Sequence, residues 1–300
     1  MIWLLTDIMI DMKPTLPDKL NIGTCSWKYD SWKGILYPHD CSNYLEEYAR
    51  HFSIVEIDQW FWSLFGEKIA LPKPETVLEY LESVPGDFTF SIKVPNAVTL
   101  THQYRKPKSP LIENPHFLSS SLFESFLKSI DPMARQIDSL IFQFEYLNKE
   151  KMPGQYHFQD QLHHFFENCP QEFRYCIEIR NKNYLNRPWF EFLKNSGLFH
   201  VFLQGYWMPP VFEIYGRFQD FIENFSLIRL HGPDRGGIEK QTRKKWNSIV
   251  APHDGELQKL KIMIQKMLSK GMSVTLNVNN HYEGSAPLTI ERFTKLWTAY

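Results

Sequence analysis

Eight short apolar segments, rich in β-branched and aromatic residues, recur along the chain, and each ends in a polar or ionisable residue. Buried parallel strands read as apolar runs because both of their faces are covered. These segments predict strands at 21–25, 53–58, 88–93, 138–144, 174–180, 198–204, 225–231 and 273–279.

Amphipathic stretches separate most of the predicted strands. Apolar residues at helical spacing, with proline and glycine as start and stop signals, predict helices at 43–51, 75–83, 115–130, 157–168, 188–196, 255–270 and 287–299. The segment 205–224 is expected to be irregular and to hold only a short helix. The segments 94–114, with the basic residues Arg105, Lys106 and Lys108, and 232–254 are expected to be loops.

The alternation of strand and helix predicts an α/β fold with a parallel sheet. Eight such units favour a closed TIM-like (β/α)8 barrel over an open doubly wound sheet, since no phosphate-binding glycine motif follows any strand. The 300 residues suffice for one barrel, which typically needs about 250. We therefore predict a single barrel domain at 21–300, preceded by a short N-terminal extension at 1–20.

Composition narrows the class of protein. The formal net charge of −1 argues against a chain-wide basic field for nucleic acid. The apolar start of the chain is interrupted by Asp7 and is too short to cross a membrane. Four cysteines without metal-type spacing indicate free thiols. These features together predict a cytoplasmic protein with no membrane contact.

Aromatic residues make up 15% of the chain, and many of them fall in predicted loops. Examples are Trp27, Trp32, Trp60, Trp62 and Trp207. They pack against the barrel, or they line a pocket mouth that suits sugars, bases or other ring-shaped ligands. The sequence leaves both interpretations open.

The polar strand ends predict a site, because active sites in such barrels form where the strands end. Glu56, Glu178 and His231 are the candidate catalytic residues, as proton carriers for acid–base chemistry. Asp58 follows Glu56 by two residues and therefore points to the same face. The sequence leaves the cofactor open.

Three cations accompany these groups at the strand ends. Lys93, Arg180 and Arg229 are predicted to bind an anionic substrate, since arginine grips carboxylate or phosphate with two parallel hydrogen bonds. The alternative is a purely structural network that pairs Glu178 with Arg229 and Lys93 with Glu56. With three competing cations nearby, we predict no metal site. The basic run 240–245 is a solvated surface or a lid arm that holds phosphate.

Several motifs, taken in order, resemble the YecE-like family, a domain of unknown function. They are Gly23 to Trp27, Trp32 to Gly34 with Tyr37-Pro38, Val55 to Asp58, Phe88 to Lys93, Thr101-His102, Phe142 to Phe144, Glu178 to Arg180, Arg229 to Gly232, and Asn279-Asn280 with Gly284 and Ala286. The resemblance covers about 21–298 and implies a TIM-like barrel without an established reaction. Within these motifs, Trp27, His102, Gln143, Asn279 and Asn280 complete the predicted substrate-binding set.

The chain departs from the family pattern at three places. Glu145-Tyr146 replaces a Pro-Pro pair after the fourth strand, and Tyr184-Leu185 stands near a usual Ser-Trp. Gln204 stands where an acidic residue is usual near the end of the sixth strand. If that acid is catalytic in relatives, the site of this chain is altered or inactive.

Three functions follow as hypotheses. The first is an enzyme that binds a small anionic or sugar-like substrate at the barrel mouth and acts as a hydrolase, isomerase or lyase. The second is nucleic-acid processing or repair by metal-assisted phosphodiester hydrolysis, which the near-neutral charge makes less favoured. The third is a ligand-binding protein without catalysis. The reaction, the substrate and the oligomeric state stay open.

Overall fold

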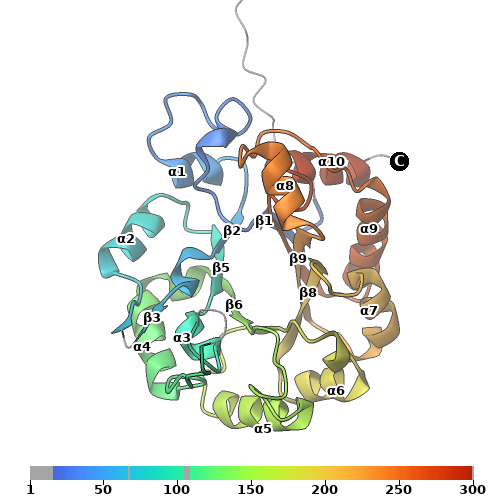
Figure 1. Cartoon of the computed structure of the whole chain (residues 1–300). Helices are drawn as coiled ribbons and strands as arrows, with labels where there is room; N and C mark the ends of the chain where they lie inside the picture. The colour runs from blue at the N-terminus through green and yellow to red at the C-terminus, as the bar shows by residue number, and fades with distance from the viewer. Residues whose placement is uncertain (1–15, 67, 105–108, 299–300) are drawn as a thin grey trace, which may run out of the picture.

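The computed structural model describes residues 16–66, 68–104 and 109–298. Eight parallel strands form a barrel in the order β1-β10-β9-β8-β7-β6-β5-β2, and helices surround it (Figure 1). The strands are β1 (Leu20–Thr24), β2 (Ile54–Ile57), β5 (Thr89–Lys93), β6 (Ile137–Gln143), β7 (Tyr175–Glu178), β8 (Phe199–Gly205), β9 (Phe225–Gly232) and β10 (Ser273–Val278). All eight predicted strands are present, and the predicted TIM-like α/β fold is confirmed.

The helices lie outside the barrel. They are α1 (Tyr44–Ala49), α2 (Pro74–Glu82), α3 (Asn96–Thr99), α4 (Ser120–Ile130), α5 (Gln155–Phe166), α6 (Arg187–Asn195), α7 (Val211–Phe218), α8 (Arg235–Thr242), α9 (Asp254–Ser269) and α10 (Ala286–Thr298). A hairpin of β3 (Leu64–Phe65) and β4 (Lys68–Ile69) follows β2. No helix in the described part of the chain is both long and apolar enough to cross a bilayer.

Three local predictions need correction. The segment 232–254 is not all loop, because the Asp234 carboxylate accepts a hydrogen bond from the Gly237 N–H at 2.8 Å and so caps α8. Two glycines, which are poor helix formers, hide this helix in the sequence. The segment 94–114 holds the short α3. The helix predicted at 115–130 begins later, at Ser120, because the Ser119 side chain caps it.

Two other predictions concern segments that are described only in part. Residues 1–15 of the expected extension lie outside the described residues, as do Arg105, Lys106 and Lys108. The helix predicted at 287–299 is observed as α10, and its last predicted position is also outside the described range.

The barrel closes between β1 and β2 through a side chain. These two strands are not paired with each other. Instead, the hydroxyl of the buried Tyr48 accepts a hydrogen bond from the Thr24 N–H at 2.9 Å and donates one to the Ile54 carbonyl at 3.0 Å. A Cβ on Gly23 would lie 2.2 Å from the Ile54 oxygen, so only glycine lets the strands approach this closely. We call this junction the seam.

The interior of the barrel has two kinds of layer. One is an apolar cluster to which β6, β7, β8 and β9 contribute Ile141, Cys176, Val201, Phe225 and Leu227. Above this cluster, toward the carboxyl ends of the strands, the interior side chains are charged or polar. The strands also carry buried polar contacts outside this charged layer, because the Thr275 hydroxyl on β10 donates to Asp138 on β6 at 3.1 Å and the Ser139 hydroxyl donates to Ser91 at 3.3 Å.

Candidate functional site

Arg229 on β9 is the centre of the polar layer, and it is only 1% exposed. Its Nε and Nη2 donate to the two carboxylate oxygens of Glu56 on β2, at 2.8 and 2.6 Å. Its Nη1 donates to Glu178 on β7 and to Gln143 on β6, the latter at 3.3 Å. Asn277 on β10 also donates to Glu56, at 3.3 Å. One guanidinium therefore ties together four strands.

Glu178 is the second carboxylate of this network. Besides Arg229, its Oε1 lies 2.6 Å from Nη2 of Arg180. Burial alone would raise the pKa of Glu178, but Arg180 and Arg229 outweigh it and lower the pKa to about 2. Glu178 therefore stays ionised at neutral pH and is a weak base.

The structural network predicted from the sequence forms in part. Glu178 pairs with Arg229 as expected. Glu56 also pairs with Arg229 and not with Lys93. The reason is the geometry of the guanidinium fork, which matches a carboxylate at two atoms where an ammonium group offers a point charge. All three guanidinium nitrogens of Arg229 thus donate to protein groups.

Lys93, at the end of β5, has no carboxylate oxygen within ion-pair distance among the described residues. Its Nζ lies over the ring of Phe61, 3.8 Å from the centroid. Burial, together with the positive charge of Arg229, lowers the pKa of Lys93 to about 8. A part of its amine is therefore neutral near physiological pH.

Asp58 directly follows β2 and is the one acid at the strand ends whose pKa is raised toward neutrality. Burial, and then the charge of Glu56, raise the pKa of Asp58 to about 6. The sequence placed Asp58 on the same face as Glu56, but nothing in the sequence showed that Arg229 would engage Glu56 and leave Asp58 without such a partner. Asp58 is therefore a candidate proton carrier that the sequence-based set lacks.

His231 on β9 is buried between two other polar groups. Its Nδ1 lies 3.2 Å from the Tyr206 hydroxyl, and its Nε2 lies 3.9 Å from Sγ of Cys25. Burial, followed by the charges of Arg229 and Arg180, holds the pKa of His231 well below its usual range. The imidazole is therefore neutral at physiological pH and takes up a proton poorly.

A cavity of about 610 Å³ opens beside this network at the carboxyl ends of the strands. We call it the mouth cavity. It is lined by Phe61, Leu100, Tyr104, Gln143, Phe144, Glu145, Tyr146, Arg180, Lys182, Tyr206, Trp207 and Met208. Its volume falls in the range of small-molecule sites, which is about 300–1,000 Å³.

Arg180 joins the mouth cavity to the buried network. Its guanidinium carbon lies 4.8 Å from the centroid of the Tyr206 ring, a cation–π contact. Its Nη1 is buried and has no hydrogen-bond partner among the described residues. Tyr206 has a φ of +54°, which is unfavourable for a residue with a Cβ. Such strain is often found at functional sites.

Six residues predicted to bind substrate do not line the mouth cavity, namely Lys93 and Arg229, described above, and Trp27, His102, Asn279 and Asn280. Trp27 is buried against Tyr80, with ring centroids 5.1 Å apart. Nδ1 of His102 lies 3.0 Å from the hydroxyl of the preceding threonine. Asn279 accepts a hydrogen bond from the His281 N–H at 3.0 Å, and Asn280 accepts one from the backbone N–H of residue 286 at 2.8 Å. The two asparagines shape the loop after β10.

Gln204 does not belong to the ring of polar groups at the mouth. Its Oε1 accepts a hydrogen bond from the Val211 N–H at 3.0 Å, and its Nε2 donates to Glu256 on α9 at 3.0 Å. The side chain therefore faces helices α7 and α9, outside the barrel. An acid missing at this position leaves the buried network unchanged.

Some of the tryptophans predicted to lie in loops pack against the barrel, and others are exposed where they could line a pocket. Trp27, Trp32 and Trp60 are buried in the protein, whereas Trp62 and Trp207 are largely exposed. Trp207 lines the mouth cavity, and so do three tyrosines that the sequence-based set lacks, namely Tyr104, Tyr146 and Tyr206. The sequence signal for Tyr146 and Tyr206 is their position shortly after a strand, whereas Tyr104 lies beyond α3.

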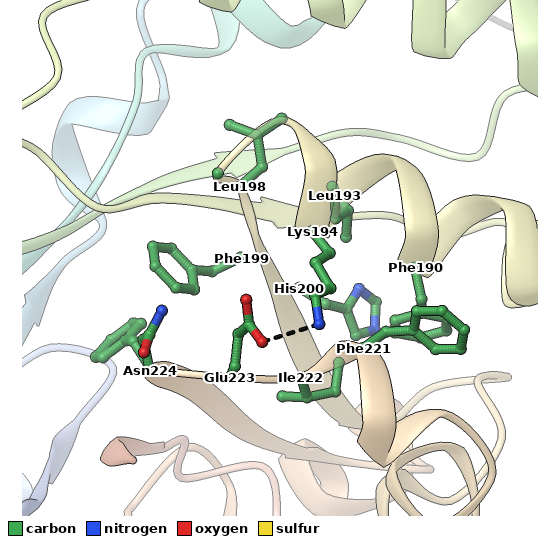
Figure 2. A pocket seen from close by; sticks show the side chains of 12 residues that line it. Phe190, Leu193, Lys194, Leu198, Phe199, His200, Phe221, Ile222, Glu223 and Asn224 are labelled. Carbon is green, nitrogen blue, oxygen red and sulfur yellow. Dashed lines mark ion pairs between the residues drawn. The ribbon is translucent and has the colours of Figure 1, made fainter. Parts of the chain in front are cut away.

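A second, smaller cavity of about 70 Å³ lies at the opposite end of the barrel. It is formed between α6 and the amino ends of β8 and β9, and Figure 2 shows its apolar walls and the ion pair of Lys194 with Glu223, at 2.9 Å. In such barrels this end serves stability. The cavity is also too small for most substrates.

Among the described residues, no group of three or more histidine, cysteine, aspartate or glutamate side chains is arranged to hold a metal ion. The four cysteines are free thiols. Cys25 is buried, and burial, with the charge of Glu56, raises its pKa well above the usual value.

The comparison with known families agrees with the motifs. The sequence model of the family described as protein of unknown function DUF72 matches residues 21–300. This chain belongs to the DUF72 family. The UPF0759 protein YecE of Escherichia coli (strain K12) is 30% identical over 178 residues, which are 59% of this chain and 54% of that protein. The match thus spans about half the length of that relative.

Solved structures from the DUF72 family share the fold. A family member from Enterococcus faecalis V583 has a TM-score of 0.66 at 21% identity, over 94% of this chain and 96% of that chain. Another, from Thermotoga maritima MSB8, has a TM-score of 0.65 at 20% identity, over 93% of this chain and 99% of that chain. At this identity the likeness concerns the fold alone.

Proposed function

We propose that this DUF72 protein is an enzyme that binds a small anionic substrate in the mouth cavity, with Arg180 as the group that receives the anion. The observation that carries the proposal is Arg180, which lines a cavity of about 610 Å³ and has a buried Nη1 without a hydrogen-bond partner among the described residues. A buried donor without a partner is costly, and an acceptor on a ligand would satisfy it. Lys182 adds a second cation to the same wall.

The charges around Arg180 favour an anion over a cation. Of the acids near the cavity, Glu178 is paired with two arginines, and Glu145 is paired with Lys151. The carboxylates are therefore already neutralised by the protein. Arg229, which the sequence also suggested as an anion ligand, is the clamp that holds Glu56 and Glu178.

We assign acid–base chemistry to Asp58 and Lys93, which lie at the ends of β2 and β5 within electrostatic reach of Arg229 and Glu56 and beside the residues that line the mouth cavity. Their pKa values of about 6 and about 8 bracket neutral pH, which is where a proton carrier works best. Glu178, with a pKa of about 2, and His231, with a strongly lowered pKa, remain in one protonation state. Glu56 has both of its oxygens engaged by Arg229.

The binding part of the proposal is tested by thermal unfolding with inorganic phosphate and malonate as probes. A ligand that binds only the folded state stabilises it by about 2.7 kcal/mol at one hundred times its Kd. We expect the wild type to be stabilised and Arg180→Gln to lose this response. Arg187→Gln is the matched control, since Arg187 is exposed on α6 and pairs with Glu191. Equal responses of wild type and Arg180→Gln would refute the proposal.

One observation favours a second candidate, a ligand-binding protein without turnover. The network of Glu56, Arg229 and Glu178 is fully paired, which is a rigid arrangement for catalytic carboxylates. The two functions differ in proton transfer. In D₂O, an acid–base enzyme would exchange carbon-bound hydrogens of pyruvate or dihydroxyacetone phosphate, and Asp58→Asn would slow the exchange. Stabilisation without any exchange would favour the binding protein.

A further inference from the structure

The rim of the mouth cavity carries aromatic side chains from four separate loops. Tyr104, Tyr146 and Trp207 line it and are 57, 60 and 88% exposed, and they follow β5, β6 and β8. Trp62, which follows β2 and is 59% exposed, contacts the Tyr104 ring with centroids 5.7 Å apart. Large apolar groups gathered in the open are unfavourable in water and mark binding sites.

The floor of the same cavity is aromatic and cationic at once. Tyr206 lines it, with the Arg180 guanidinium over its ring. The positive φ of Tyr206 aims consecutive side chains, Tyr206 and Trp207, toward one cavity. Leu100 and Met208 complete walls that are mostly apolar. The cavity therefore offers flat apolar faces beside the guanidinium of Arg180.

We propose that the ligand of the mouth cavity consists of a planar aromatic ring joined to one anionic group. The ring lies among Tyr104, Tyr146 and Trp207, and the anion meets Arg180. The inference rests on the proposed function and adds the chemical class of the substrate. Aromatic rings stack well on such faces because offset and edge-on arrangements are favourable.

The composition of the walls disfavours a sugar as the main body of the ligand. A sugar ring carries hydroxyl groups around its edge, and each buried hydroxyl needs a hydrogen-bond partner. The exposed surface of the walls is mostly apolar although Gln143, Glu145 and Lys182 carry polar groups, so a sugar ring would set many of its hydroxyl groups against apolar surface, whereas a flat aromatic ring needs no partner for its faces. Two sources supply a ring with an anion, namely a mononucleotide and an aromatic carboxylic acid.

Calorimetric titration separates the parts of this ligand. The probes are AMP and indole-3-acetate as ring-bearing anions, adenosine and indole as rings alone, phosphate and acetate as anions alone, and glucose 6-phosphate as a sugar-bearing anion. We expect at least one ring-bearing anion to bind tenfold more tightly than its fragments and than glucose 6-phosphate. Which of AMP and indole-3-acetate binds identifies the source.

Variants of exposed residues test the placement of the ring without disturbing the fold. Trp207→Ala and Tyr146→Ala are each expected to weaken binding of the ring-bearing anion about tenfold and to leave phosphate binding unchanged. Base–aromatic stacking has an effect of this order. Tyr156→Ala is the matched control, because Tyr156 is 69% exposed on α5 and does not line the cavity.

Several outcomes would overturn the inference. The inference is wrong if glucose 6-phosphate binds as tightly as AMP, or if neither ring-bearing anion binds. It is also wrong if Trp207→Ala and Tyr146→Ala leave binding of the ring-bearing anion unchanged. A third contrary result is an oligothymidylate that binds tenfold more tightly than AMP. The last result would identify a single-stranded nucleic acid as the occupant. Failure of the proposed function gives a different result from failure of this inference. If the proposed function is wrong, Arg180→Gln leaves phosphate binding unchanged, whatever the effect of Trp207→Ala.

Discussion

The seam between β1 and β2 depends on one hydroxyl group, and Tyr48→Phe removes it. The change leaves the Thr24 N–H and the Ile54 carbonyl without their shared partner, in a place where Tyr48 is fully buried. Each unsatisfied buried backbone group costs about 1–3 kcal/mol. A water molecule that enters the vacated space would reduce this cost. We therefore expect a loss of about 2–4 kcal/mol in the free energy of unfolding.

Urea denaturation followed by circular dichroism measures this loss as a lower transition midpoint with an unchanged slope. Tyr44→Phe is the control on the same helix, because the Tyr44 hydroxyl donates to Asp30 in an exposed position at 2.9 Å. It is expected to change stability by less than about 0.5 kcal/mol, as surface substitutions usually do. A Tyr48→Phe protein as stable as Tyr44→Phe would refute the bridging role of the hydroxyl.

Three further predictions concern the charges of the mouth. Arg229→Met leaves the buried carboxylate of Glu56 without its cation and Glu178 with Arg180 alone, and it should cost about 3–5 kcal/mol. Glu56→Gln in the same chain should partly restore the stability. Urea titration measures both effects, and a loss under about 1 kcal/mol would contradict the role of Arg229 in holding the two carboxylates. The pKa of Asp58 is raised from 3.8 to about 6, so the folded state binds more protons than the unfolded state in this window, and stability falls by up to about 3 kcal/mol as the pH rises from about 4 to 6. Asp58→Asn should flatten that slope in pH-dependent unfolding, and an unchanged slope would assign it to other groups. Acetylation of Lys93, followed by mass spectrometry, should be half-maximal near pH 8 because burial lowers its pKa, whereas a midpoint near 10.5 would show an ordinary lysine.

The positions of the strands could be predicted from the sequence because the signal is local. Each strand is a short run of apolar residues with a polar residue at its end, and the spacing of the runs leaves room for a helix between most of them. That pattern predicts a barrel and places Glu56, Lys93, Glu178, Arg180 and Arg229 at one end of it. These five residues do meet in the interior or at the wall of the mouth cavity.

The facing direction of each side chain could not be predicted in the same way. In a buried parallel strand both faces are apolar, so the two-residue alternation that separates inside from outside is weak. Gln204 is an example: it lies near the end of a strand, as Gln143 does, yet its side chain faces α7 and α9. Only the register between neighbouring strands decides which of the two glutamines points into the barrel.

The sequence by itself determined the barrel and the end of it that holds the charged residues, because strand and helix signals lie within a few neighbouring residues. The tertiary structure decided which charges are free. Arg229 engages Glu56 and Glu178, from strands that lie 173 and 51 residues away, and among the described residues this leaves Asp58 and Lys93 without an ion pair, while Arg180 shares Glu178 with Arg229. Such pairings depend on distances and burial between remote segments, and these quantities exist only once the chain has folded.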